Sequence, residues 1–249
     1  MILLLALLSG LESQTILRTL DAHFAGGYLL MDAASKQVIG SRGLDPKEPV
    51  AIGSLIKPFT AIAYGEAYGF HYPEFTCTGK DCWLPKGHGH IYIGDAISHS
   101  CNAYFLSLAE QLNPASVVAT LASLNVTAPS AEVEKKTLIG MGAAWKFKPH
   151  EITSAYAEIA RRWAQPGMRE AVVGLREAAK TGTAQQLGSF SMAKTGTAPC
   201  DRDSGDGFVI AMFPADSLRY VLMVRVHNTT GARAAAALAP AFHRIRDGK

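Results

Sequence analysis

A serine and a lysine stand three residues apart at two places in the chain, Ser54–Lys57 and Ser191–Lys194. A serine hydroxyl is a poor nucleophile near neutral pH, and it becomes effective when a neighbouring base takes its proton. A Ser-x-x-Lys pair whose side chains share one face could therefore supply the nucleophile and the base of a covalent catalyst. Because so short a pattern also arises by chance, the surrounding sequence has to decide between the two pairs.

The surrounding sequence favours the first pair. Apolar residues recur at helical spacing over 54–69, and a proline follows Lys57, in the first turns of the helix. Residues three apart lie on one face of a helix, so the Lys57 amine can approach the Ser54 hydroxyl. Ser191 and Lys194 instead precede β-rich sequence, and residues three apart on a strand face opposite sides. We therefore predict that Ser54 is the nucleophile and Lys57 its base.

The pentapeptide Lys-Thr-Gly-Thr-Ala also occurs twice, at 180–184 and at 194–198. The first copy follows a helix-like run, and no strand pattern comes after it. The second copy precedes two β-rich runs, 207–215 and 219–228, with which it can pair as an extended strand. An edge strand lets a substrate peptide add as a further strand, and Gly196 allows a close approach to the backbone. The second copy is therefore predicted to be the functional one.

The order of the predicted elements is strands, a long helical middle, then strands and a final helix. Such an order is typical of an α+β fold, in which an antiparallel sheet is flanked by helices and an all-α lobe is inserted between its first and last strands. We expect one domain over 11–249, with a sheet lobe at about 20–53 and 188–249 and a helical lobe at about 54–187. The other predicted elements are two strands within 27–41, helices near 95–112, 114–124 and 151–163 (with Trp163 on the buried stripe), and a terminal helix from about Ala232.

The composition is that of an ordinary globular protein, with 48% apolar and 18% charged residues among 249. The net charge of +3 is spread along the chain, so nucleic acid is not an expected partner. The apolar run 1–8 is too short to span a bilayer, which needs about 20 residues. Residues 1–10 are interpreted as a remnant of an export signal or anchor, through which the chain could associate with a membrane. The alternative is a first helix that packs on the core.

The cysteines leave two interpretations open. Cys77 and Cys82 bracket a short loop in which a local disulfide is feasible if the chain is exported. With the histidines of 88–90 they could also bind zinc, but their spacing matches no common zinc module, and we expect no metal. Cys101 and Cys200 lie far apart in the sequence and are expected to be small buried hydrophobic residues.

Taken together, three motifs resemble the active-site set of penicillin-binding transpeptidases, a family that also includes D,D-carboxypeptidases and serine β-lactamases. They are Ser54-x-x-Lys57 at a helix start, Ser-Cys-Asn at 100–102 and the strand-borne Lys-Thr-Gly-Thr at 194–197. The first pentapeptide copy resembles the helix-to-strand connection of these domains. The resemblance covers roughly 25–245, and further matching stretches are 51–67, 77–105 and 139–160.

The resemblance implies a bacterial enzyme that acts outside the cytoplasm. Ser54 would be its nucleophile and would become acylated. Its substrate would be a D-Ala-D-Ala stem peptide of peptidoglycan, and β-lactams would be covalent ligands. Lys57 would be the base, and Ser100 would pass a proton to the leaving amine; the backbone N–H groups of Ser54 and Thr197 would bind the oxyanion. No metal or organic cofactor is needed. The residues expected to bind substrate are Asn102, Lys194, Thr195, Gly196 and Thr197.

Two other functions stay open at this point. A serine β-lactamase would share the acylation step, but the Glu-x-x-Leu-Asn and Tyr-Gly-Asn patterns of deacylating enzymes are absent. A non-catalytic sensor or peptidoglycan-binding module could use the same scaffold. The motifs do not distinguish transpeptidation from carboxypeptidation, and they do not give the oligomeric state.

Overall fold

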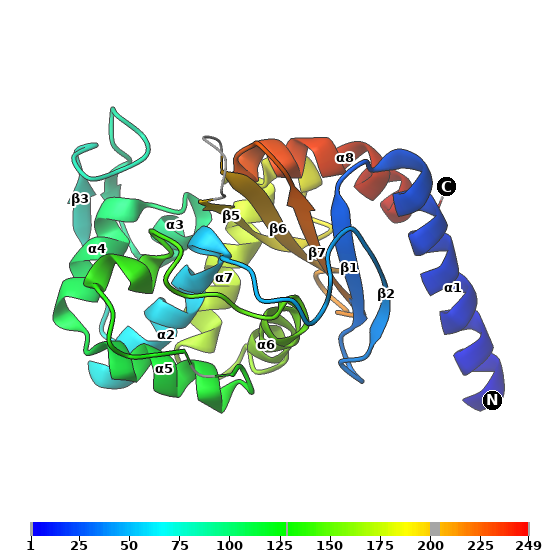
Figure 1. Ribbon diagram of the computed structural model, residues 1–249, viewed down its shortest axis with the longest axis horizontal. Helices are drawn as coiled ribbons and strands as arrows, with labels where there is room; N and C mark the ends of the chain where they lie inside the picture. The colour runs from blue at the N-terminus through cyan, green and yellow to red at the C-terminus, as the bar shows by residue number, and fades with distance from the viewer. Residues whose placement is uncertain (1, 128, 200–204, 249) are drawn as a thin grey trace.

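The computed structural model describes residues 2–127, 129–199 and 205–248. A five-stranded antiparallel sheet runs in the order β2-β1-β7-β6-β5, and a helical lobe is inserted between β2 and β5 (Figure 1). This is the α+β arrangement that the order of elements predicted. The strands of the sheet are β1 (Gly27–Asp32), β2 (Val38–Arg42), β5 (Met192–Ala198), β6 (Asp206–Phe213) and β7 (Tyr220–Val226).

The helical lobe also contains a two-stranded ribbon, and a helix lies at each end of the chain. Short 3₁₀ turns are η1 (Gly53–Ile56), η2 (Lys135–Ile139) and η3 (Gln185–Leu187), and the ribbon is β3 (Phe75–Cys77) with β4 (Gly89–Ile91). The α-helices are α1 (Ile2–His23), α2 (Lys57–Ala67), α3 (Ile93–Ser98), α4 (Asn102–Gln111), α5 (Pro114–Ser123), α6 (Pro149–Arg161), α7 (Met168–Lys180) and α8 (Gly231–Asp247).

Both faces of the sheet are covered, which explains why its last strands are almost continuously apolar in sequence. Leu29, Ile210 and Met223 point into the core shared with the helical lobe. Leu30 and Val209 point to the opposite face, where they pack against side chains of α1 and α8. Every residue of β6 is buried. The alternation of side chains along each strand thus divides the core into two parts.

The predicted three-stranded unit is confirmed: β5 pairs with β6, and β6 pairs with β7, both antiparallel. β5 is also an edge strand, as expected for the second pentapeptide copy. The first copy begins at the end of α7 and continues into the connection toward β5.

Two predicted helices end differently from the sequence pattern. The helix expected over 95–112 is interrupted between α3 and α4, because Ser100 takes a left-handed conformation with φ of 53° that breaks the helical ladder. α6 ends at Arg161, since the backbone leaves helical geometry at Arg162. Trp163 is therefore not part of the buried stripe, and it is 59% exposed.

The segment expected to be helical from Ser54 starts more tightly than predicted. Ser54 lies on the 3₁₀ turn η1, and the α-helix begins at Lys57. The Lys57 N–H donates to the Ser54 carbonyl across this turn. The two residues therefore remain one turn apart on a continuous helical segment, although the first turn is narrower than an α-helix.

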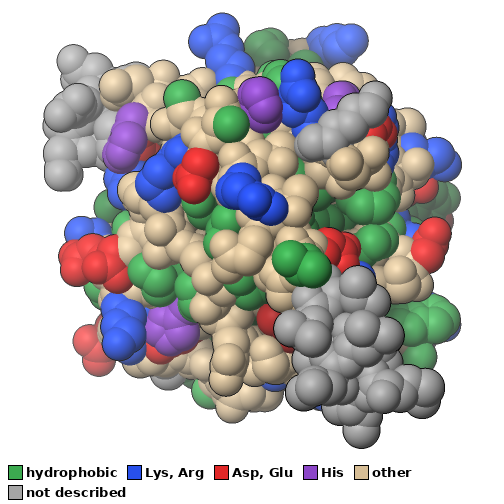
Figure 2. Space-filling model, turned by 90° about the vertical axis from the view of Figure 1, so that its right-hand side faces the viewer, with side chains coloured by type: hydrophobic (Ala, Val, Ile, Leu, Met, Phe, Trp, Pro, Cys, Tyr) green, Lys and Arg blue, Asp and Glu red, His purple; other side chains and the backbone are tan. Residues whose placement is uncertain are grey.

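α1 lies beside α8 at the end of the molecule opposite the helical lobe (Figure 1). Ile16 and Leu20 of α1 are buried against this part of the core. No helix in the described part of the chain is both long and apolar enough to cross a membrane. The interpretation of residues 1–10 as a signal or anchor remnant stays a prediction. On the face of this end that Figure 2 shows, basic and acidic side chains are interspersed among the residues drawn in colour.

The turn that carries Ser54 is fixed to α6 by one buried hydrogen bond. The Tyr156 hydroxyl donates to the Leu55 carbonyl at 2.8 Å, and its ring packs edge-on against Phe59 with centroids 5.5 Å apart. Both side chains are inaccessible to solvent.

Replacing Tyr156 by Phe should therefore lower the free energy of unfolding by about 1–3 kcal/mol, because the buried Leu55 carbonyl would lose its partner. Urea denaturation checks this value. The exposed Tyr92 provides the matched control, and Tyr92→Phe should stay within about 0.5 kcal/mol of the native chain. Equal effects of the two substitutions would contradict the anchoring role of Tyr156.

Candidate active site

The predicted site residues meet in one cavity of about 340 Å³ between β5 and the helical lobe. Ser54 and Ser100 contribute hydroxyl groups to it, and β5 supplies one wall. The described residues that line it are Ser54, Trp83, Ser100, Asn102, Gly140, Met141, Thr183, Thr195, Gly196, Thr197, Thr230 and Ala232. Lys57 and Lys194 are buried beneath this lining.

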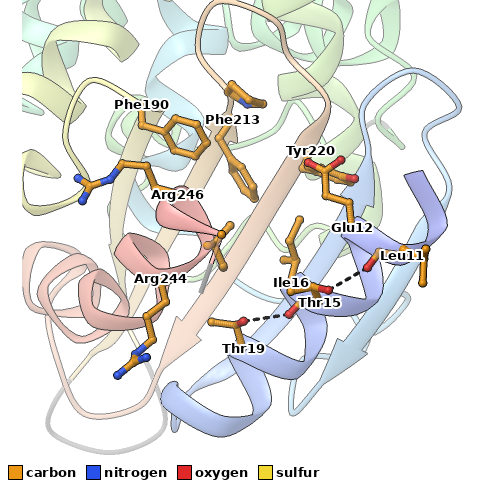
Figure 3. A pocket seen from close by; sticks show the side chains of 13 residues that line it. Leu11, Glu12, Thr15, Ile16, Thr19, Phe190, Phe213, Tyr220, Arg244 and Arg246 are labelled. Atoms are coloured by element: carbon orange, nitrogen blue, oxygen red, sulfur yellow. Dashed lines mark hydrogen bonds between the residues drawn. The ribbon is translucent and has the colours of Figure 1, made fainter. Parts of the chain in front are cut away.

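A larger cavity of about 500 Å³ lies between α1, α8 and the sheet (Figure 3). Its walls include the rings of Phe190, Phe213 and Tyr220. The hydroxyls of Thr15 and Thr19 donate to carbonyls of α1 itself, both at 2.9 Å. This cavity holds none of the predicted catalytic groups, so the smaller cavity is the candidate active site.

Lys57 is held by acceptors rather than by an acidic partner. Its Nζ donates to the Ser100 carbonyl at 2.8 Å and to Asn102 Oδ1 at 2.6 Å, and it lies 3.4 Å from Ser100 Oγ. Burial lowers the pKa of Lys57 to about 7, although the nearby thiols of Cys101 and Cys82 oppose this shift. A neutral amine has two N–H groups, which these two oxygens satisfy, so its lone pair is free to accept a proton.

Lys194 enters the same site from β5. Its Nζ donates to Ser100 Oγ at 2.8 Å and to the Thr195 carbonyl at 2.8 Å. Burial, together with the charge of Lys57, lowers the pKa of Lys194 well below its usual value. The Ser100 hydroxyl therefore lies between two buried amines, as a group that relays a proton must.

Ser54 borders the cavity close to these amines. Its hydroxyl makes no hydrogen bond to another residue in the described ranges, and none joins it to Lys57. Hydrogen bonds between nucleophile and base are often long in a free enzyme and shorten when substrate binds. The structure thus brings the predicted pair to one site without a hydrogen bond between them.

Backbone segments meet in this site without intervening side chains. Gly53 has φ of 54°, and a Cβ there would overlap with the backbone of Thr197; a Cβ on Gly140 would overlap with the Gly53 carbonyl. A Cβ on Gly196 would overlap with the Ile52 carbonyl. The chain's own packing therefore requires glycine at 196. The sequence had suggested a different reason, the close approach of a substrate to the backbone. This packing sets the backbone around Ser54 beside that of Thr197.

The first pentapeptide copy contributes a residue to the site that the sequence did not predict. Lys180 is exposed on the surface, but Thr183 lines the cavity. The Thr195 hydroxyl donates to Thr183 Oγ1 at 2.7 Å, and the Thr183 N–H donates to the Ser98 carbonyl at 3.2 Å. The connection after α7 thus links α3 to β5. Two signals in the sequence marked this segment: the repetition of the pentapeptide, and its resemblance to the helix-to-strand connection of transpeptidase domains.

A cluster of sulfur and nitrogen atoms lies next to the turn over 99–102 that carries Ser100. The ligand atoms of Cys77, Cys82, His88 and Cys101 all lie within 4.8 Å of one another, and the three thiols are free. His88 Nδ1 is 3.5 Å from the sulfur of Cys77 and of Cys82, and the sulfurs of Cys82 and Cys101 are 3.8 Å apart. The sequence had suggested His90 as the fourth ligand; His90 instead contacts Glu74 on the surface.

The three distances given for this cluster fit those around a tetrahedral zinc ion. With Zn–S near 2.3 Å and Zn–N near 2.0–2.1 Å, tetrahedral geometry puts sulfurs about 3.8 Å apart and sulfur about 3.5 Å from nitrogen. Three cysteines and one histidine form a closed structural donor set. Contrary to the expectation of a merely hydrophobic residue, Cys101 belongs to this set; Cys200 lies outside the described residues. When bound, zinc would hold the loop between Cys77 and His88 against α4.

Neither a protein-family model nor a curated protein sequence matches this chain. The penicillin-binding protein PBP2 of Pseudomonas aeruginosa superposes with a TM-score of 0.76 at 16% identity, over 93% of this chain and 75% of that chain. The transpeptidase domain of penicillin-binding protein 3 from Burkholderia pseudomallei superposes with a TM-score of 0.70 at 17% identity, over 94% of this chain and 92% of that chain. PBP2 of Helicobacter pylori gives 0.77 at 15% identity, over 94% of this chain and 62% of that chain.

This protein therefore has the fold of the transpeptidase domains of penicillin-binding proteins, the architecture that its motifs predicted. At identities of 15–17% the likeness establishes the fold, and the chemistry has to be argued from the residues of the site.

The metal cluster gives a direct prediction. The chain purified without chelators should contain about one zinc ion per molecule by elemental mass spectrometry, because the cluster offers one closed four-ligand site. Cys82→Ser should reduce this content strongly, since one of the four ligands is lost.

His90→Gln is the matched control, because His90 lies in the same loop region but outside the cluster, and it should retain the zinc. A metal-free native chain, or equal zinc loss in both variants, would contradict this assignment of ligands.

Proposed function

We propose that this protein is a penicillin-binding serine D,D-peptidase that acts outside the cytoplasm of a bacterium. The D-Ala-D-Ala end of a peptidoglycan stem peptide would acylate Ser54, and β-lactams would acylate the same hydroxyl and inhibit the enzyme. The observation that carries this proposal is the placement of Ser100 Oγ between two buried lysine amines in the cavity that Ser54 borders.

Acylation would begin at the Ser54 hydroxyl. The neutral Lys57 amine takes the hydroxyl proton while Ser54 Oγ attacks the carbonyl carbon of the penultimate residue. The carbonyl oxygen becomes an oxyanion, which accepts hydrogen bonds from the backbone N–H groups of Ser54 and Thr197. The packing of Gly53 against the Thr197 backbone supports this pairing of donors, since it sets the two backbones side by side.

The leaving group then needs a proton. The Ser100 hydroxyl gives its proton to the departing amine, or to the lactam nitrogen, as the C–N bond breaks. The proton taken by Lys57 returns to Ser100 Oγ, which lies 3.4 Å from the Lys57 Nζ. Water or an acceptor amine later attacks the Ser54 ester and releases the acyl group, so one scaffold can serve hydrolysis or transpeptidation.

Substrate binding would use the groups left free by these contacts. Asn102 Oδ1 already accepts from Lys57, so its NH₂ group remains to donate to a carbonyl of the substrate. The terminal carboxylate would lie near Thr195 and Thr197 on β5, above the buried amine of Lys194. No Asp or Glu is among the described residues lining the cavity, which favours a long-lived acyl-enzyme over a β-lactamase.

Fluorescent penicillin should label the native chain covalently, and Ser54→Ala should abolish labelling because it removes the proposed nucleophile. Ser191→Ala is the matched control: it alters the other Ser-x-x-Lys pair, whose hydroxyl donates to the Gly188 carbonyl instead. Gel fluorescence and intact-mass spectrometry measure the adduct.

Equal labelling of Ser54→Ala and the native chain would contradict the proposal. Rapid turnover of nitrocefin without a lasting adduct would indicate a β-lactamase instead. Products of a D-Ala-D-Ala peptide, measured with and without an acceptor amine, separate transpeptidation from carboxypeptidation.

The pH dependence of acylation follows from the state of Lys57. Because its neutral form is the base and its pKa is about 7, the second-order rate constant for acylation should rise with pH through that value. Between pH 6 and pH 8 the neutral fraction of such a group increases about tenfold. Stopped-flow measurements with a chromogenic cephalosporin check this profile, and a rate that is flat over this range would contradict the assignment.

A further inference from the structure

Trp83 is a large side chain at the edge of the catalytic cavity that the proposed chemistry does not use. It lies in the loop between two cluster residues, directly after Cys82, and it is 52% exposed. Its indole N–H donates to the carbonyls of His99 and Ser100 at 3.1 and 3.2 Å. Trp83 thus lines the cavity and also donates a hydrogen bond to the turn that carries Ser100.

The turn that Trp83 contacts is strained. Ser100 has φ of 53°, in the left-handed region that residues other than glycine seldom adopt, and such a conformation persists only where its surroundings hold it. The Ser100 carbonyl accepts from Lys57 Nζ on the buried side and from Trp83 on the cavity side. These two donors fix the plane of this peptide, and with it the direction in which Ser100 Oγ points.

The position of Trp83 depends in turn on the cysteine–histidine cluster. Its ring packs edge-on against His88, with centroids 5.4 Å apart, and His88 also stacks on His99 at 5.5 Å. His88 Nε2 is buried without a hydrogen-bonding partner among the described residues. Ring packing by Trp83 and His99, rather than a hydrogen bond, therefore orients this ligand.

The loop itself is tied at its base. The sulfurs of Cys77 and Cys82 lie close together at one side of it, and the Gly87 backbone packs so closely against Cys77 that a Cβ would overlap with the Cys77 carbonyl. The Gly87 N–H donates to the Leu84 carbonyl, and the Cys82 N–H donates to the Gly79 carbonyl. A displacement of Cys82 or His88 would consequently move Trp83 with it.

We propose that Trp83 is a positioning residue that couples zinc in the cluster of Cys77, Cys82, His88 and Cys101 to the alignment of Ser100, so that loss of the metal slows acylation of Ser54. The proposal rests on the proposed function. With the cluster closed, Trp83 holds the Ser100 carbonyl and the hydroxyl stays between Lys57 and Lys194. With the cluster open, Trp83 releases the turn and that alignment is lost, although the residues that touch substrate are unchanged.

Trp83→Phe tests the hydrogen bond, because it keeps an aromatic ring beside His88 and removes the N–H donor. The zinc-loaded variant should acylate with a β-lactam about three- to tenfold more slowly than the native chain, the range expected for one hydrogen bond. Its zinc content and its unfolding midpoint in urea should stay unchanged. Trp163→Phe, at an exposed position outside the cavity lining, is the matched control and should acylate at the native rate.

Metal removal tests the coupling. A strong zinc chelator should slow acylation of the native chain and of Trp163→Phe by the same factor. In Trp83→Phe that factor should be clearly smaller, because the link through the indole is already broken. In the Trp163→Phe background, chelation should also shift the tryptophan emission to longer wavelength as Trp83 leaves the turn, and zinc should reverse the shift.

The outcomes separate the two proposals. Equal chelation factors in Trp83→Phe and the native chain, or emission that does not respond to zinc, would overturn the role of Trp83 while Ser54 labelling stands. A zinc-loaded native chain that no β-lactam labels would overturn the proposed function itself. Native acylation kinetics in Trp83→Phe would show that the indole N–H does not position Ser100.

Discussion

Two lysine amines are buried around one serine hydroxyl, and the rest of the site depends on keeping them there. Ser100 Oγ accepts from Lys194 at 2.8 Å and lies 3.4 Å from the Lys57 Nζ. Two ammonium groups so close together in a buried site repel each other, and each loses hydration, so burial favours a neutral amine. A neutral amine, which could act as a base, is thus favoured near neutral pH, and no acidic residue is among the described residues that line the cavity. The hydroxyl between the amines supplies the route by which a proton can cross the site.

The two amines stay beside Ser100 only if the sheet and the helical lobe pack closely against each other. Lys57 belongs to α2 and Lys194 to β5, so the distance between them depends on packing across the junction as well as on their shared contact with Ser100 Oγ. Backbone segments pack directly against one another in this region, because the glycines at 53, 140 and 196 have no room for a Cβ. Tyr156 adds a hydrogen bond from α6 to the same turn. Interiors packed this tightly transmit small displacements, which is why residues remote from the nucleophile matter to its geometry.

The sequence predicted the parts of this structure that are encoded locally. Helical spacing distinguished Ser54–Lys57 from Ser191–Lys194, and the strands after Lys194 indicated which pentapeptide copy lies at the sheet edge. Contacts between segments distant in sequence could not be read in this way. Thr183 reaches β5 because α7 ends beside it, and Cys101 joins a cluster whose ligand spacing matches no familiar module. The helical segment expected over 95–112 is divided into two helices because one strained residue, Ser100, interrupts the helical pattern.

That strained residue also explains why the cluster lies where it does. Ser100, Cys101 and Asn102 are consecutive, so one turn presents a hydroxyl to the catalytic cavity, a sulfur to the cluster and an amide oxygen to Lys57. The Cys101 sulfur also accepts the Tyr104 N–H at 3.5 Å, which joins the cluster to the first turn of α4. A left-handed residue in a short turn costs about 1–3 kcal/mol unless its surroundings compensate. Four ligand atoms closing on one ion would provide such compensation, and the turn over 99–102 would then depend on a metal that lies outside the lining of the cavity.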